Sequence, residues 1–229
     1  MNINLCEEEC DRMETIAARY HLNCMSTFRE VASSIEQVVY GMGGKLLHRG
    51  FYCPSLIRDI VNGNIHRGKI RRDLKAKSKA IFEFGLDIQG RPVTVQQLDR
   101  REFIFHHNNS ELSVVFSEAF GVIELSECNF DLAGNLKSYS LFQYNPFQQR
   151  VVELEKEIYD YNGNQLDVLW CRFNRYNQVN PIFDCYQYRF AVENDYLTSY
   201  QVLPCEQNAP LNYQVFPVRI KRMVKEKSS

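Results

Sequence analysis

Closely spaced turn signals from residue 80 onward are the feature that most restricts the fold of this 229-residue chain. Short runs rich in Phe, Tyr, Val and Ile alternate with turns of Gly, Asn and Pro. Such runs favour strands, and Asn-Gly or Gly-Asn pairs supply the positive φ that tight hairpins require. The spacing of roughly ten to fifteen residues therefore predicts an antiparallel meander of about nine or ten strands over residues 81–218.

The first 65 residues carry a different, helical pattern. Apolar residues at spacings of three and four form one stripe over residues 7–20 and a second stripe from Phe28 to Val39, which Gly41 ends. Residues 54–61 predict a short third helix. Amphipathic helices need neighbours to bury their apolar faces. We therefore expect an α+β fold, with an N-terminal helical cluster followed by a long antiparallel β-meander with repeated hairpins.

Charge is unevenly distributed along the chain, although the formal net charge is only −1. Residues 1–80 carry 13 basic and 9 acidic side chains, residues 81–218 carry 9 and 18, and residues 219–229 carry 5 and 1. We divide the chain into a helical segment (1–65), a basic connector (66–80), an acidic β-sheet (81–218) and a basic tail (219–229). An extended surface of one sign attracts partners of the opposite sign.

The hairpin around Asn162-Gly163 shows where the negative charge of the sheet gathers. Pairing Tyr161 with Asn164 sets three glutamates at alternate positions of one strand, about 7 Å apart, beside a tryptophan of the next strand. Such a face suits protein docking, because Tyr and Trp are favoured where one edge stays wet. The alternative is the solvated outer face of a half-buried sheet. The predicted contact residues are Glu153, Glu155, Glu157, Asp160 and Trp170.

One hairpin pattern recurs three times along the predicted sheet. The first copy begins Phe130-Asp-x-x-Gly, the second begins Tyr159-Asp-x-x-Gly, and a looser third copy spans residues 190–200. These copies resemble degenerate tyrosine–aspartate repeats, which build β-structure in large bacterial rearrangement-hotspot and wall-associated toxins. Similar hairpin patterns also occur in small proteins. These small proteins resemble the immunity proteins that accompany polymorphic toxins.

The resemblance and the charge together imply a non-enzymatic, cytoplasmic immunity protein. Its acidic, aromatic sheet would occlude a basic toxin domain, such as a nuclease, encoded by a neighbouring gene. The acidic start of the chain, without the basic and apolar regions of a secretory signal, agrees with a cytoplasmic location. We expect no cofactor, no bound metal and no catalytic residue, because no catalytic motif stands out in the sequence.

Nucleic-acid binding is the first alternative function. Residues 66–79 hold seven basic side chains and one acidic one, and residues 219–227 are also basic. Basic runs of this kind contact phosphates. However, no aromatic residue that could stack on bases is interleaved with residues 66–79, so a solvated linker explains the same run.

A metal-dependent hydrolase is the second alternative. The candidate zinc ligands are Cys6, Cys10, His21 and Cys24. Their spacing departs from the usual zinc motifs, and the eight cysteines are irregularly placed, so we expect reduced thiols rather than disulfides. His106 and His107 are the other candidates for catalysis. Adjacent residues of a strand point to opposite faces, which argues against one shared catalytic site.

Overall fold

One antiparallel sheet makes up most of the molecule. The computed structural model describes residues 3–22, 24–43, 48–61, 68–176, 181–194, 196–204 and 211–219. The helices are α1 (Ile3–Leu22), α2 (Cys24–Ala32) and α3 (Leu56–Val61), with 3-10 helices at Gly50–Tyr52 and Leu74–Lys79. The strands are β1 (Gln37–Met42), β2 (Lys69–Arg71), β3 (Phe82–Leu86), β4 (Pro92–Gln97), β5 (Arg100–His106), β6 (Ser110–Ser117), β7 (Gly121–Phe130), β8 (Leu136–Asn145), β9 (Arg150–Asn162), β10 (Gln165–Asn174), β11 (Ile182–Glu193), β12 (Tyr196–Pro204) and β13 (Leu211–Arg219).

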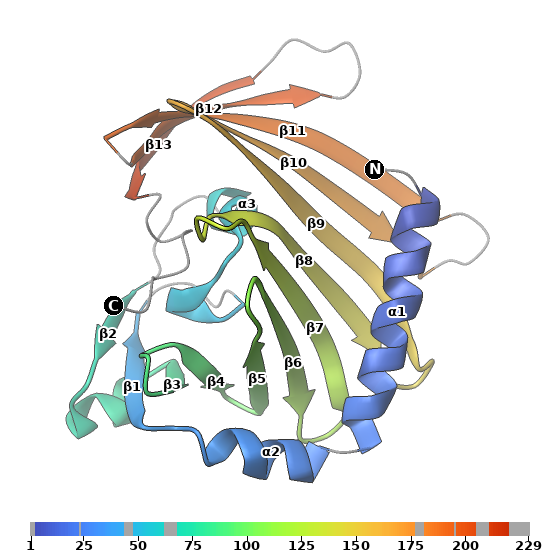
Figure 1. Cartoon of the computed structure of the whole chain (residues 1–229), viewed down its shortest axis with the longest axis vertical. Coiled ribbons are helices and arrows are strands. Elements are labelled where there is room, and N and C mark those ends of the chain that lie inside the picture. Colours follow the sequence, from blue (N-terminus) through green and yellow to red (C-terminus); the bar gives the residue numbers. More distant parts are fainter. Residues whose placement is uncertain are drawn as a thin grey trace.

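The strand order confirms the predicted meander with repeated hairpins. The eleven strands from β3 to β13 follow one another in chain order, each antiparallel to the next, and β1 and β2 extend the sheet beyond β3. Each copy of the repeated pattern makes a hairpin, at the β7–β8, β9–β10 and β11–β12 connections. Figure 1 shows that the sheet is strongly curved, with α1 on its outer side and α3 on its inner, concave side.

The predicted second helix is only partly correct. α2 ends at Ala32, and the rest of the predicted apolar stripe lies in β1, where Val39 pairs with Phe84 of β3 and Tyr40 pairs with Arg71 of β2. β-branched and aromatic residues favour strands, and pairing with two neighbours outweighs the helical spacing. The predicted segment 1–65 is therefore no separate helical unit within the described residues, because its β1 belongs to the sheet.

The predicted linker at residues 66–80 is also wrong in its described part. Residues 69–71 form the edge strand β2, and a 3-10 helix follows at Leu74–Lys79. Exposed lysine and arginine side chains along such an edge hinder pairing with another chain. Of the predicted basic tail, only Arg219, the last residue of β13, lies within the described residues.

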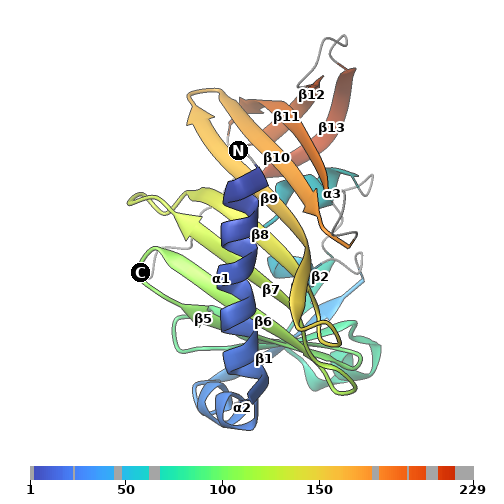
Figure 2. The same cartoon turned by 90° about the vertical axis from the view of Figure 1, so that its right-hand side faces the viewer.

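The outer face of the sheet holds a continuous apolar core beneath α1. Its centre is a row of direct cross-strand neighbours from β5 to β10, all buried: Phe103, Val114, Leu125, Phe142, Leu154 and Phe173. α1 covers this row with Cys6, Cys10, Met13 and Ala17, whose spacings of three and four place them on one helix face. Figure 2 shows α1 lying across the strands of this face.

The expectation that all cysteines are reduced is wrong for one pair. Cys171 of β10 and Cys185 of β11 are direct cross-strand neighbours with their Cα atoms 4.3 Å apart, and a disulfide joins them. Strand register brought these two thiols together, which the irregular spacing of the cysteines did not reveal. Among the described cysteines, Cys6, Cys10, Cys53 and Cys128 form no disulfide. Cys205 and the side chain of Cys24 lie outside the described residues.

Candidate functional site

Six glutamates line the concave face of the sheet. Alternation along β5 to β9 places them on the side opposite α1, where they belong to neighbouring cross-strand rows. One row runs from Glu102 through Glu124 to Glu153, and another runs from Glu111 to Glu157. Such a concentration of carboxylates needs compensating charge if it is buried. The six are Glu102, Glu111, Glu124, Glu153, Glu155 and Glu157.

Arg49 supplies much of this compensation from the segment that precedes α3. Its guanidinium donates to Glu102 (Nε to Oε1, 2.8 Å), Glu111 (Nη1 to Oε2, 3.0 Å) and Ser126 (Nη2 to Oγ, 3.0 Å). Burial alone would raise the pKa of Glu102, but the charges of His48 and Arg49 outweigh it and lower that pKa to about 2. This fully buried arginine therefore holds two carboxylates in their ionised form.

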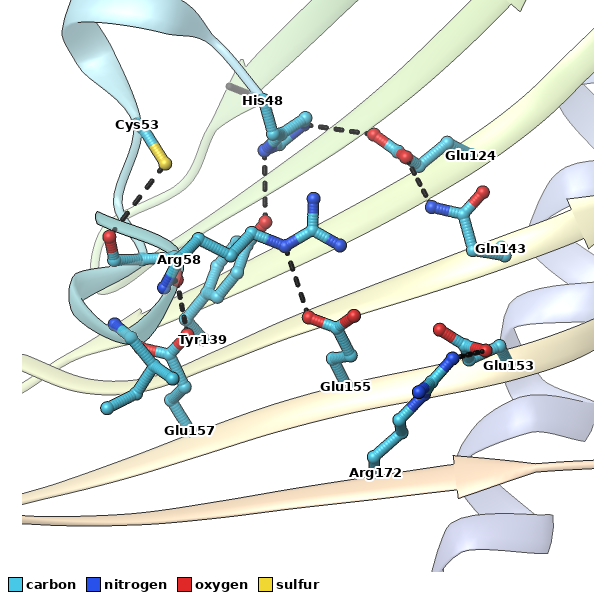
Figure 3. A network of polar contacts seen from close by, with 12 residues as sticks. His48, Cys53, Arg58, Glu124, Tyr139, Gln143, Glu153, Glu155, Glu157 and Arg172 are labelled. Carbon is cyan, nitrogen blue, oxygen red and sulfur yellow. Dashed lines mark hydrogen bonds and ion pairs between the residues drawn. The ribbon is translucent and has the colours of Figure 1, made fainter. Parts of the chain in front are cut away.

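His48 links the arginine cluster to the next strands. Its Nε2 lies 3.1 Å from Oε1 of Glu102 and 3.5 Å from Oε1 of Glu124, and its Nδ1 lies 3.0 Å from the Tyr139 hydroxyl. The other oxygen of Glu124 accepts a hydrogen bond from Gln143 at 2.6 Å. Figure 3 shows the His48 imidazole between Glu124 and Tyr139, with a contact to each, and Gln143 beside Glu124.

The glutamates of β9 have partners from two directions. Arg58 of α3 donates through Nε to Glu155 at 3.1 Å, and Arg172 of β10 donates to Glu153 at 2.7 Å (Figure 3). Asn174 adds a second hydrogen bond to Glu153 at 2.8 Å. These two carboxylates are thus neutralised within the molecule.

Glu157 has hydrogen-bond donors instead of a cation. Its carboxylate accepts the backbone N–H of Leu56 at 3.2 Å and of Ile57 at 3.4 Å, and also contacts the hydroxyls of Ser55 and Tyr159. Burial raises its pKa to about 7, although these hydrogen bonds oppose the rise. Glu157 therefore attaches the start of α3 to the middle of the sheet.

The predicted exposed acidic surface is consequently wrong. Glu153, Glu155, Glu157 and Trp170 do share the concave face, but Glu157 is 1% exposed and Glu153 is 9% exposed. Asp160 lies on the opposite face, because it is an odd number of residues away from the glutamates along β9. The segment at 48–61, far away in the sequence, covers and neutralises the row, and pairing arguments within one hairpin could not reveal this.

The predicted register of the β9–β10 hairpin also differs from the structure. Asn162 pairs with Gln165, so Trp170 lies opposite Glu157 rather than Glu155. This shift by two residues leaves every side chain on its predicted face, because strand side chains alternate with a period of two. Trp170 packs beside Tyr186 with ring centroids 5.7 Å apart, so the predicted aromatic character of this face is present.

Four exposed apolar side chains from neighbouring turns lie at one end of the sheet. We define the hairpin-tip surface as Leu98 in the β4–β5 turn, Phe120 in the β6–β7 turn, Phe147 in the β8–β9 turn and Tyr176 after β10. Phe120 is 50% exposed and Phe147 is 82% exposed, yet their ring centroids are 5.8 Å apart.

Backbone contacts bring these turns side by side. The N–H of Glu118 donates to the carbonyl of Asp99 at 3.4 Å, and the N–H of Arg175 donates to the carbonyl of Val152 at 2.9 Å. At the opposite end, Ile88 and Leu132 are exposed in turns that the polar β5–β6 turn separates. In the sequence, Gly121 and the Asn145-Pro146 pair indicate the turns at Phe120 and Phe147, and an aromatic residue within a turn is the signal that could have identified this surface.

The predicted zinc ligands do not come together in the described part of the chain. Cys6 and Cys10 point into the core beneath α1, and His21 follows Cys10 by eleven residues, about 16 Å along a helix. No group of three or more potential ligands among the described residues is arranged to hold a metal ion. His106 contacts Glu111 (Nδ1 to Oε1, 3.1 Å), whereas His107 is exposed, so the two histidines do not share a site.

None of the described helices is both long enough and apolar enough to cross a membrane. No protein-family model matches this sequence, and no curated protein matches it either.

Proposed function

We propose that this protein is a non-enzymatic binding protein that holds a partner protein at the hairpin-tip surface. The observation that carries the proposal is the contact between Phe120 and Phe147, two aromatic rings that are exposed and adjacent at the tips of neighbouring hairpins. Isolated exposed apolar residues are ordinary, but an adjacent group at one end of a sheet is typical of an interaction site.

The chemistry of the surface favours a protein partner. Aromatic residues dominate the energy of protein interfaces, because a large ring loses much apolar area to water when it enters a pocket of the partner. The tips stand on hairpins of one continuous sheet, so little conformational entropy is lost when they bind. The glutamates of the concave face are already paired or hydrogen-bonded internally and contribute little to such an interface.

The partner to test first is a toxin domain encoded by a neighbouring gene, as the resemblance of the hairpin repeats implies. In this proposal the protein is an immunity protein that occludes its toxin with apolar hairpin tips. Binding would then change little between low and high salt, because screening weakens charge pairs and not apolar contacts. A partner held by an acidic sheet would instead be released by salt.

The experiment compares binding of that neighbouring gene product to three forms of the protein by calorimetry. Phe147→Ser should lower the affinity by about tenfold or more, as expected for an interface hot spot. Leu132→Ser is the matched control, because Leu132 is 95% exposed in a turn at the opposite end of the sheet. The proposal fails if no protein encoded by a neighbouring gene binds, or if both variants weaken binding equally.

Nucleic-acid binding at the edge strand is the second candidate. Among the described residues of this edge, six cations are exposed: Lys69, Arg71, Arg72, Lys75, Lys77 and Lys79. Such a group attracts phosphates, and the affinity would fall steeply with salt. A gel-shift assay with single-stranded and double-stranded DNA and RNA at low salt tests this candidate. An unchanged mobility in all four cases excludes it.

A further inference from the structure

A cavity of about 330 Å³ opens on the concave face. Its floor consists of side chains that β4 to β7 direct to this face, namely Val95, Glu102, Val115 and Glu124. One wall is the segment that carries His48, Arg49 and Arg58, and the other is the β4–β5 turn from Gln97 to Arg100. Strands and segments that are distant in the sequence thus meet around one small space.

Most of the charged side chains that line this cavity are already paired: Arg49 with Glu102 and Glu111, and Arg58 with Glu155, while His48 lies beside Glu102 and Glu124. This leaves one cation and one anion at the rim, Arg100 and Asp99, which make no ion pair with the described residues. A ligand with a single charge would pair with only one of these two rim groups and leave the other without a partner. A ligand that carries one positive and one negative group matches both rim groups and leaves no charge without a partner.

The charged side chains of the cavity differ in how many hydrogen bonds they can still make with a ligand. Arg49 already donates to three acceptors. The guanidinium of Arg100 makes no side-chain hydrogen bond or ion pair with the described residues, and its planar fork suits a carboxylate. Glu124 accepts a hydrogen bond from Gln143 at one oxygen and lies 3.5 Å from His48 at the other, and Asp99 is exposed at the rim with Ser117 at 3.5 Å. Each carboxylate oxygen has a second acceptor site, so both side chains can also accept from an ammonium group.

Apart from His48 and Gln97, the remaining lining is apolar, and the volume is small. Phe82, Val95 and Val115 contribute hydrophobic surface beside the charged groups. The volume lies at the lower end of the range of about 300–1,000 Å³ that ligand pockets span. A small molecule with an aliphatic portion therefore fits better than a nucleotide or a peptide.

We propose that this cavity binds a free α-amino acid with an aliphatic side chain. The carboxylate of the amino acid binds Arg100, its ammonium group binds Glu124 and Asp99, and its side chain packs against Val95 and Val115. The cavity opens on the concave side of the sheet, but its β4–β5 wall includes Leu98 of the hairpin-tip surface, so the inference is tested on the protein without its partner.

Calorimetry with three probes tests the inference on the full chain without any partner protein. The probes are L-leucine, 4-methylpentanoate, which lacks the amine, and 3-methylbutylamine, which lacks the carboxylate. L-leucine should bind with a Kd below about 1 mM, and each singly charged probe should bind at least about tenfold more weakly. The inference is overturned if L-leucine gives no binding at about 10 mM, or if either singly charged probe binds as tightly.

Two variants locate the binding site. Arg100→Gln removes the charge that recognises the carboxylate and should weaken L-leucine binding by about tenfold or more. Arg71→Gln removes an exposed arginine on the edge strand β2 and should leave the affinity unchanged. Thermal unfolding of both variants shows whether they are folded. Equal L-leucine affinities for the folded Arg100→Gln variant and the unsubstituted protein contradict the inference.

Discussion

The Glu157 carboxylate in the middle of β9 accepts the backbone N–H of Leu56, the first residue of α3, at 3.2 Å. These residues are 101 positions apart in the sequence, and their contact fixes α3 against the concave face of the sheet. Glu157 is fully buried and has no arginine or lysine partner among the described residues, so its state of protonation affects the stability of the fold.

We predict that stability decreases between pH 5 and pH 8 because of Glu157. Its pKa rises from 4.5 in the unfolded chain to about 7 in the folded protein. Between these two pKa values the folded state binds more protons than the unfolded state. The stability that Glu157 contributes is therefore complete below the unfolded pKa and is lost as the pH rises through 7. The loss should be roughly 3 kcal/mol. Urea unfolding of the unsubstituted protein and Glu157→Gln across this range should show a smaller decrease for the variant.

Glu102 and Glu111 should have the opposite dependence at acid pH. Burial alone would raise the pKa of each carboxyl, but His48 and Arg49 at Glu102, and His106 and Arg49 at Glu111, lower both values to about 2. The stability they provide is present above the unfolded pKa of 4.5 and is lost as the pH falls through 2. Acid unfolding followed by circular dichroism should begin at a higher pH in Arg49→Met than in the unsubstituted protein. An unchanged acid transition would contradict this prediction.

Removal of the Arg49 side chain should be among the most destabilising single substitutions. Arg49→Ala leaves Glu102 and Glu111 buried without their shared cation, which typically costs about 3–5 kcal/mol. Arg71→Ala is the matched control, because Arg71 is exposed and such surface changes usually stay within about 0.5 kcal/mol. Guanidinium unfolding at pH 7 measures both. A cost for Arg49→Ala as small as that of the control would show that the ion pairs do not support the fold.

The core beneath α1 should tolerate truncation poorly. Met13 is completely buried between α1 and the apolar row of the sheet, so Met13→Ala should cost about 2–5 kcal/mol through lost apolar burial and a residual cavity. Glu8→Ala changes an exposed position of the same helix and should have little effect. Thermal unfolding of the two variants provides the comparison. Equal midpoints would indicate that α1 does not pack on the sheet as described.

The meander could be predicted from sequence because its signals are local. Strand residues and turn residues alternate over short distances, and the Gly163 turn marks its hairpin whatever the rest of the chain does. The placement of β1 could not be predicted in the same way. Val38 and Val39 fit a helical stripe as well as a strand, and only pairing with β3 and β2, which lie later in the chain, decides between them.

In the candidate site, too, local sequence predicts one part of the arrangement, and contacts with a distant segment decide the rest. Alternation along β9 places Glu153, Glu155 and Glu157 on one face, which the sequence shows. Whether that face is exposed depends on the segment at 48–61, which folds over it and supplies Arg49 and Arg58. Nothing in the spacing of these residues indicates that contact. A row of glutamates is therefore insufficient evidence for an acidic surface.

The most direct test of the proposed function is hydrogen–deuterium exchange of the protein alone and in complex with the toxin domain encoded by the neighbouring gene. If the partner binds at the hairpin-tip surface, exchange in the complex should be slower at residues 118–121 and 146–149. Exchange should be unchanged at residues 131–135, at the opposite end of the sheet. Protection confined to residues 131–135, or to the edge strand β2, would contradict this prediction.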